Sequence, residues 1–123
     1  MNENTGDVFV GNIVILPAMK LDKAILAEIK MRVIKAEPDA KIILYGSYAR
    51  GDANEESDID LLILVDKEKI TYQDQVRITD PLYSFGLETT KIISALVQTK
   101  DNWEQKYYYT PLYHNIKKEG KEI

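Results

Sequence analysis

The most constraining feature of this chain is the run from Ile59 to Val65, which is apolar at every position except Asp60. A short run so rich in Ile, Leu and Val is typical of a strand that is buried on both faces and therefore central in a sheet. Asp58 and Asp60 stand at its start, and because side chains alternate along a strand they point to the same face, about 7 Å apart. Two such carboxylates repel each other unless a cation neutralises them, and Mg²⁺ commonly takes one or two carboxylates plus substrate phosphates.

A second strand is predicted over Lys41–Tyr45, and Gly46 and Ser47 follow at its end, with ten residues between Ser47 and Asp58. A strand, a small-residue turn and a helix start together offer backbone N–H groups and a hydroxyl to an anion. Each of the two motifs also has a purely structural interpretation. Gly-Ser can be an ordinary turn, and Asp-x-Asp can be a solvated strand end. A phosphate cradle beside a metal-binding acid pair, however, indicates phosphoryl or nucleotidyl transfer.

The segment Gly46–Asp52, followed by Ser57–Leu61, resembles the signature of the DNA polymerase beta-like nucleotidyltransferase superfamily. Its Gly-Ser-x10-Asp-x-Asp spacing is similar to that of the minimal nucleotidyltransferases, short prokaryotic members often encoded beside a HEPN-domain partner. The resemblance is strongest from Ile42 to Val65. It implies a two-layer nucleotidyltransferase-like α/β fold, with a central mixed sheet flanked by helices.

The resemblance also implies roles for single residues. Mg²⁺ is the expected cofactor and ATP the expected substrate. The residues expected to bind the nucleotide are Gly46, Ser47, Arg50 and Ser57. The residues expected to bind the metal and to catalyse the reaction are Asp58, Asp60 and Glu88, the last as the third carboxylate that such sites carry on a neighbouring strand.

Two of these assignments leave alternatives open. Glu88 is the only acid near the start of a strand predicted over Leu87–Val97, so it is either the third ligand and general base or an exposed residue at the strand end. Without it, the site has two carboxylates and the protein is a slow enzyme or only a nucleotide binder. Arg50 either binds a phosphate through two parallel hydrogen bonds or pairs with Asp52 or another acid of the loop.

Composition excludes several classes of protein. At 123 residues the chain is long enough for one domain, and its lack of cysteine rules out disulfides and thiolate zinc sites. A net charge of −4 argues against direct nucleic-acid binding, which needs a basic surface. The apolar stretch from Val8 to Leu16 is too short to span a bilayer and no basic region precedes it, so neither a membrane nor secretion is indicated and the cytoplasm is the expected location.

The predicted organisation is an N-terminal extension over residues 1–18, with a possible hairpin, and a nucleotidyltransferase domain over residues 19–123. A first helix with apolar residues from Leu21 to Val33 is expected to end before Pro38. Thr71 with Asp74 predicts a capping box that opens a helix. That helix is expected to restart or kink at Pro81 and to end at Gly86. Strand Leu87–Val97 follows, then a short helical segment, and a last helix begins at Thr110–Pro111.

Two classes of function follow. The first is a Mg²⁺-dependent enzyme that transfers a nucleoside monophosphate, AMP from ATP, to a hydroxyl. The resemblance implies that this hydroxyl is a tyrosine of a HEPN-type partner toxin, which makes the chain a protein adenylyltransferase and an antitoxin. The second is a non-catalytic nucleotide-binding or interaction module that neutralises a partner by contact. A stand-alone small-molecule nucleotidyltransferase is favoured if no HEPN-like gene lies beside this one. Either homo- or hetero-oligomers are compatible with these functions.

Overall fold

The computed structural model describes residues 8–10, 13–15 and 23–123. Near the N-terminus, β1 (Val8–Val10) and β2 (Ile13–Ile15) pair antiparallel, with Val8 opposite Ile15. The boundary predicted at residue 18 and the helix start at Leu21 lie outside the described residues, so the division into an N-terminal extension and a nucleotidyltransferase domain stays a prediction. No helix in the described part of the chain is long and apolar enough to cross a membrane.

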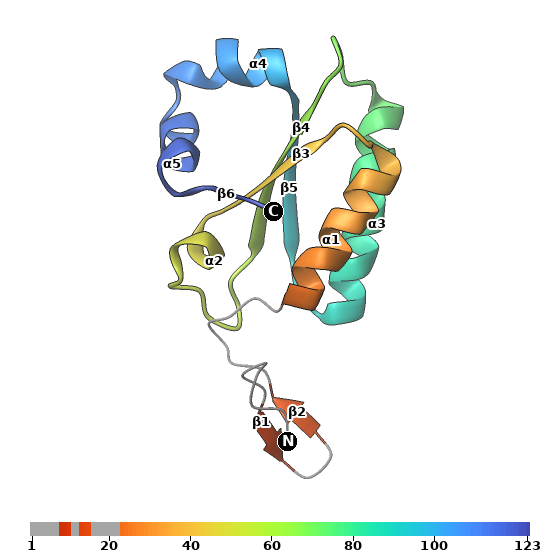
Figure 1. Cartoon of the computed structure of the whole chain (residues 1–123), viewed down its shortest axis with the longest axis vertical. Coiled ribbons are helices and arrows are strands. Elements are labelled where there is room, and N and C mark those ends of the chain that lie inside the picture. Colours follow the sequence, from red (N-terminus) through yellow and green to blue (C-terminus); the bar gives the residue numbers. More distant parts are fainter. Residues whose placement is uncertain (1–7, 11–12, 16–22) are drawn as a thin grey trace.

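The body is a four-stranded mixed sheet in the order β5–β4–β3–β6 (Figure 1). Its central strand β4 lies antiparallel to β3 and parallel to β5, and β6 closes the edge beside β3. The strands are β3 (Lys41–Tyr45), β4 (Ile59–Val65), β5 (Ile93–Thr99) and β6 (Lys121–Glu122). The helices are α1 (Lys23–Ala36), α2 (Ser47–Arg50), α3 (Tyr72–Thr89), α4 (Lys100–Gln105), the 3₁₀ turn η1 (Tyr107–Tyr109) and α5 (Pro111–Glu119). The α/β fold with a central mixed sheet flanked by helices is confirmed.

Strand β4 is buried on both faces, as its composition predicts, and its alternate side chains divide the core in two. Leu61 and Ile63 pack toward α1 and α3, while Leu62 and Leu64 pack toward α4 and α5. The second layer centres on Trp103, which stacks on Tyr107 at a ring-centroid distance of 5.1 Å. Asp60 belongs by alternation to the face of Leu62 and Leu64.

Helix α3 is longer than its sequence indicates. It runs unbroken through Pro81 to Thr89, so a restart at Pro81 and the end predicted at Gly86 are both wrong, while a kink at Pro81 stays a prediction. The reason is a buried stripe of Ile78, Leu82 and Phe85, which continues at helical spacing past the proline and packs on the sheet. The helix ends where Thr90 takes a left-handed conformation at φ 56°.

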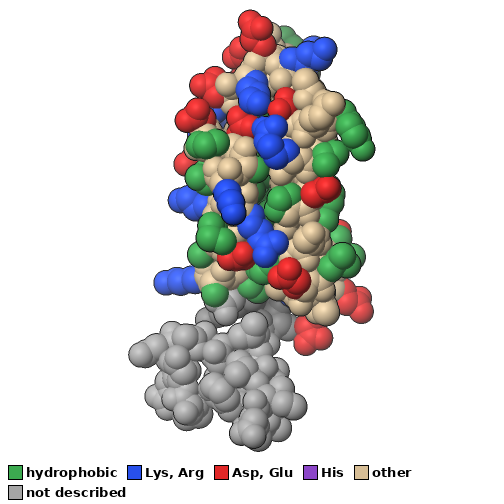
Figure 2. Space-filling model, turned by 90° about the vertical axis from the view of Figure 1, so that its right-hand side faces the viewer, with side chains coloured by type: hydrophobic (Ala, Val, Ile, Leu, Met, Phe, Trp, Pro, Cys, Tyr) green, Lys and Arg blue, Asp and Glu red, His purple; other side chains and the backbone are tan. Residues whose placement is uncertain are grey.

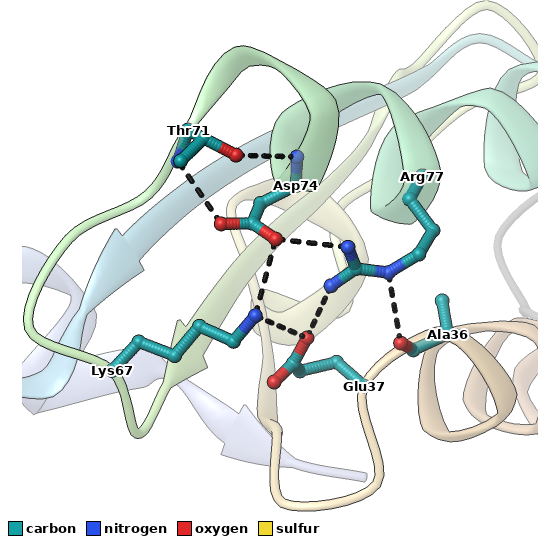
Figure 3. A network of polar contacts seen from close by, with 6 residues as sticks. All are labelled: Ala36, Glu37, Lys67, Thr71, Asp74 and Arg77. Atoms are coloured by element: carbon teal, nitrogen blue, oxygen red, sulfur yellow. Dashed lines mark hydrogen bonds and ion pairs between the residues drawn. The ribbon is translucent and has the colours of Figure 1, made fainter.

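A charged network fixes the end of the sheet where β4 finishes (Figure 3). Asp74 closes the predicted capping box by accepting from the Thr71 N–H at 3.0 Å, and its own N–H donates to the Thr71 hydroxyl at 3.1 Å. Arg77 donates to Asp74 at 2.8 Å and to Glu37 at 2.6 Å, and Lys67 donates to Asp74 at 3.1 Å. The network therefore ties the end of α1 to the start of α3, at the end of β4 remote from Asp58 and Asp60.

The outer face of α1 and α3 carries charges of both signs, with Lys and Arg side chains along its middle (Figure 2). Its arginines are paired: Arg32 lies 2.8 Å from Glu28 and 3.6 Å from Glu88, and Arg77 is held by Asp74 and Glu37. This face is therefore mixed in charge and not a basic surface of the kind that binds nucleic acid.

Candidate functional site

The turn from β3 into α2 brings backbone and carboxylate into direct contact. Gly46 has φ 75° and ψ −155°, a conformation that side-chain-bearing residues avoid. A Cβ built on Gly46 would collide with Oδ2 of Asp60, so the Asp60 carboxylate lies against the Gly46 backbone. The glycine is required both for the conformation of the turn and for this close approach.

Ser47 follows as the first residue of α2, and its hydroxyl makes no hydrogen bond with any other described residue. The Ser47 carbonyl accepts the N–H groups of Gly51 and Asp52 at 2.9 and 3.1 Å, which folds the loop back after a single helical turn. Gly51 permits that reversal with φ 84°. The loop thus leaves the Ser47 hydroxyl available beside the Gly46–Asp60 contact.

Asp60 is held in an unfavourable electrostatic position. Burial and then the nearby charge of Asp58 raise the pKa of the Asp60 carboxyl, and Arg50 offsets the effect only in part. No hydrogen bond or ion pair within the described residues holds the carboxylate of either Asp58 or Asp60. Across the sheet, burial and the charge of Asp60 raise the pKa of Tyr45, its partner in the β3–β4 ladder. An acid pair without a cationic partner fits a hard divalent cation, which would take oxygen ligands from both carboxylates.

The strand position predicted for Glu88 is wrong. Glu88 lies in the last turn of α3, its side chain is 63% exposed, and its partner is Arg32 of α1 at 3.6 Å. Among the described residues no three acidic, histidine or cysteine side chains gather as a metal site, so the expected trio of Asp58, Asp60 and Glu88 is not assembled. The physical cause is the continuation of α3 through Pro81, which places residues 87–89 on a helix.

Arg50 takes the pairing role that was one of its two alternatives. Its guanidinium lies 3.1 Å from Asp52 and 3.1 Å from Glu119 of α5. It still acts on the acid pair at longer range, because its charge lowers the pKa of Asp60. Ser57 is engaged within the loop, where its hydroxyl accepts the N–H of Asn54 at 2.9 Å. Its assignment to the nucleotide stays a prediction.

Sequence reasoning missed three residues at this site, namely Tyr45, Ser94 and Glu119. Tyr45 and Ser94 stand on either side of Asp60, in β3 and β5. The run Ile92–Val97 could have located Ser94, had the strand been started there instead of at Leu87. Glu119 is distant in sequence and reaches Arg50 only through the docking of α5, for which the sequence carries no local signal.

The fold and this strand–turn–helix with its acid pair define a nucleotidyl-transfer domain. Residues 26–121 match the family described as "Nucleotidyltransferase domain", and the chain belongs to that family. The predicted resemblance to the nucleotidyltransferase superfamily is thereby confirmed.

Two relatives come from Methanocaldococcus jannaschii. "Putative protein adenylyltransferase MJ0141" is 43% identical over 60 residues, which are 49% of this chain and 60% of that protein. "Putative protein adenylyltransferase MJ0604" is 38% identical over 83 residues, which are 68% of this chain and 76% of that protein. The chain thus matches less than two thirds of the length of the first relative. No solved structure matches the chain.

Proposed function

We propose that this protein transfers AMP from Mg²⁺-bound ATP to a hydroxyl group of another protein. The observation that carries the proposal is the contact of Asp60 with Gly46, which sets an unpaired acid pair against the turn that begins α2. The two relatives are named as putative protein adenylyltransferases, which supports a protein as acceptor. A divalent cation bound there would neutralise the acid pair and the charge of the triphosphate.

In the proposed reaction the acceptor oxygen attacks the α-phosphorus of ATP, and the bond from that phosphorus to the bridging oxygen breaks. The hydroxyl proton passes to water and pyrophosphate leaves. Ser47 and the Gly46 turn hold the phosphates, and Asp58 and Asp60 position the cation. Nearly all of the work assigned to this chain is positioning and charge stabilisation, as is usual for transfer at phosphorus.

We propose a tyrosine of a HEPN-type toxin as the acceptor, and an antitoxin role in the cytoplasm. The HEPN resemblance of the Gly-Ser-x10-Asp-x-Asp spacing supports this choice. Trp103, Tyr113 and Ile116 of α4 and α5 are buried against the sheet, so these two helices serve the core of this domain.

The test is incubation of the protein with ATP, Mg²⁺ and the HEPN-type protein encoded beside it, followed by intact mass of both chains. A mass gain on the partner equal to one or more AMP units is the expected result, and Asp60→Asn protein is the control. Calorimetry with ATP, with and without EDTA, tests the metal separately. Equal affinity in both conditions would contradict the metal site.

A second candidate is a nucleotide-binding module that neutralises its partner by contact alone. It is favoured by the absence of a third carboxylate beside Asp58 and Asp60 among the described residues. The two functions differ in one result. Asp60→Asn protein still neutralises the partner if contact suffices, and fails to do so if AMP transfer is required.

A further inference from the structure

Ser94 is the side chain that stands next to Asp60 on the neighbouring strand. Strands β4 and β5 run parallel, with Asp60 opposite Ser94 between the pairs Ile59–Ile93 and Leu61–Ala95. Paired residues on adjacent strands point to the same side of the sheet, about 4.8 Å apart. Ser94 therefore lies on the face of Asp60, and β5 brings no other side chain as close to it.

This position is open and uncharged. Ser94 is exposed, and its hydroxyl makes no hydrogen bond with another described residue. On the other side of Asp60 the β3 partner is Tyr45, whose phenol carries no charge at neutral pH. Neither neighbour of Asp60 in the sheet therefore adds negative charge, and within residues 23–123 the carboxylates available to a cation at this site are those of Asp58 and Asp60.

Two carboxylates suffice for Mg²⁺ when substrate phosphates supply further oxygens, but they bind the free ion poorly because it is reluctant to lose its water. We infer that Ser94 makes metal binding at this site dependent on the nucleotide, so that the cation and the triphosphate bind together and neither binds tightly alone. This inference rests on the proposed function, because it takes the acid pair as the metal site.

The decisive experiment is titration of the nucleotide-free protein with Mn²⁺. The electron paramagnetic resonance signal of the free ion measures how much Mn²⁺ remains unbound. Wild-type protein is expected to bind Mn²⁺ weakly, and a non-hydrolysable ATP analogue is expected to strengthen that binding at least tenfold. Ser94→Asp is expected to bind Mn²⁺ at least tenfold more tightly than wild type without nucleotide. Ser94→Asn is the matched control, because it adds nearly the same volume without the charge and should behave as wild type.

Thermal unfolding gives a second readout. A third carboxylate beside Asp58 and Asp60 adds repulsion, so Ser94→Asp should melt below Ser94→Asn in EDTA and recover in Mn²⁺ without nucleotide. The exposed position of Ser94 leaves room for either side chain.

Tight Mn²⁺ binding by nucleotide-free wild type would overturn the inference, and so would equal Mn²⁺ affinity of Ser94→Asp and Ser94→Asn. Asp60→Asn separates this failure from failure of the proposed function. If Asp60→Asn removes nucleotide-linked Mn²⁺ binding, the metal site stands and only the role of Ser94 falls. If Asp60→Asn leaves that binding intact, the acid pair is not the metal site and both proposals fall.

Discussion

At the scale of single residues, the charge of Asp60 lowers the stability of the fold and is needed for the proposed reaction. Its pKa is raised in the folded protein, so folding favours its protonated form, and its charged form destabilises the fold above that pKa. We predict that Asp60→Asn keeps or raises the melting temperature at pH 7 in EDTA. AMP transfer should fall at least about a hundredfold, because a group that positions charge is lost.

The measurements for Asp60→Asn are melting in EDTA and AMP transfer in Mg²⁺. Any stability gain should fade as the pH falls below the ordinary aspartate range, where wild-type Asp60 is also neutral. Glu55→Gln removes the same charge from an exposed position in the same loop and should change neither quantity. A less stable but active Asp60→Asn protein would show that Asp60 is a structural strand-end residue.

Two glycines of the motif loop have positive φ angles but different surroundings. A Cβ at Gly46 would collide with Asp60, whereas a Cβ at Gly51 would meet nothing within 4 Å. We predict that Gly46→Ala costs about 1–3 kcal/mol of stability and abolishes nucleotide binding. Gly51→Ala should cost about 1–2 kcal/mol from its left-handed conformation alone and retain binding. Melting and ATP calorimetry on both variants are the measurements, and equal loss of binding in both would refute the Gly46–Asp60 contact.

At the scale of elements, the sequence is most predictive where composition and spacing agree. Strands β3 and β4, the turn at Gly46 and the cap formed by Thr71 and Asp74 were all predictable, because each rests on neighbours in the chain. The acid pair of Asp58 and Asp60 was predictable for the same reason. The surroundings of Asp60 were not, since Ser94 depends on the register of β5 and Glu119 on the docking of α5.

Helix α3 is the element where local and tertiary preferences conflict. Pro81 lacks the N–H that would close the helical bond to the Arg77 carbonyl, and the packing of Ile78, Leu82 and Phe85 overrides this loss. We predict that Pro81→Ala stabilises the protein by about 1 kcal/mol, the gain in the helix being offset in part by a freer unfolded chain. Chemical denaturation measures it. A loss of stability would show that the proline ring itself packs productively.

The start of the same helix depends on a charged Asp74. Hydrogen bonds from the Thr71 backbone, Arg77 and Lys67 hold the pKa of Asp74 well below its usual range, so Asp74 stabilises the fold above the ordinary aspartate pKa and ceases to do so in strong acid. We predict that Asp74→Asn lowers the melting temperature by several degrees at pH 7. The difference from wild type should shrink toward about pH 2. A difference that is constant with pH would assign the loss to packing instead of charge.

At the scale of the whole molecule, strand β4 carries both the site and the two halves of the core. Asp60 is followed directly by Leu61, which packs under α1 and α3, and then by Leu62, which packs against Trp103 and Tyr113. A change in packing on either face of β4 therefore affects the strand that carries Asp60. For this reason the two layers should unfold together, although α1 and α3 lie on one side of the sheet and α4 and α5 on the other (Figure 1).

The only tryptophan, Trp103, reports the second layer, while far-ultraviolet circular dichroism reports the whole chain. We predict that both signals give one midpoint in urea. Leu61→Ala and Leu62→Ala, on opposite faces, should each reduce the free energy of unfolding by about 2–5 kcal/mol. Each variant should therefore have a lower midpoint in both signals. Mg²⁺ with a non-hydrolysable ATP analogue should raise it in both, because a ligand bound at Asp60 stabilises only the folded chain. If the Trp103 signal kept its midpoint in Leu61→Ala while the dichroism shifted, the layers would be independent and the site would belong to one of them alone.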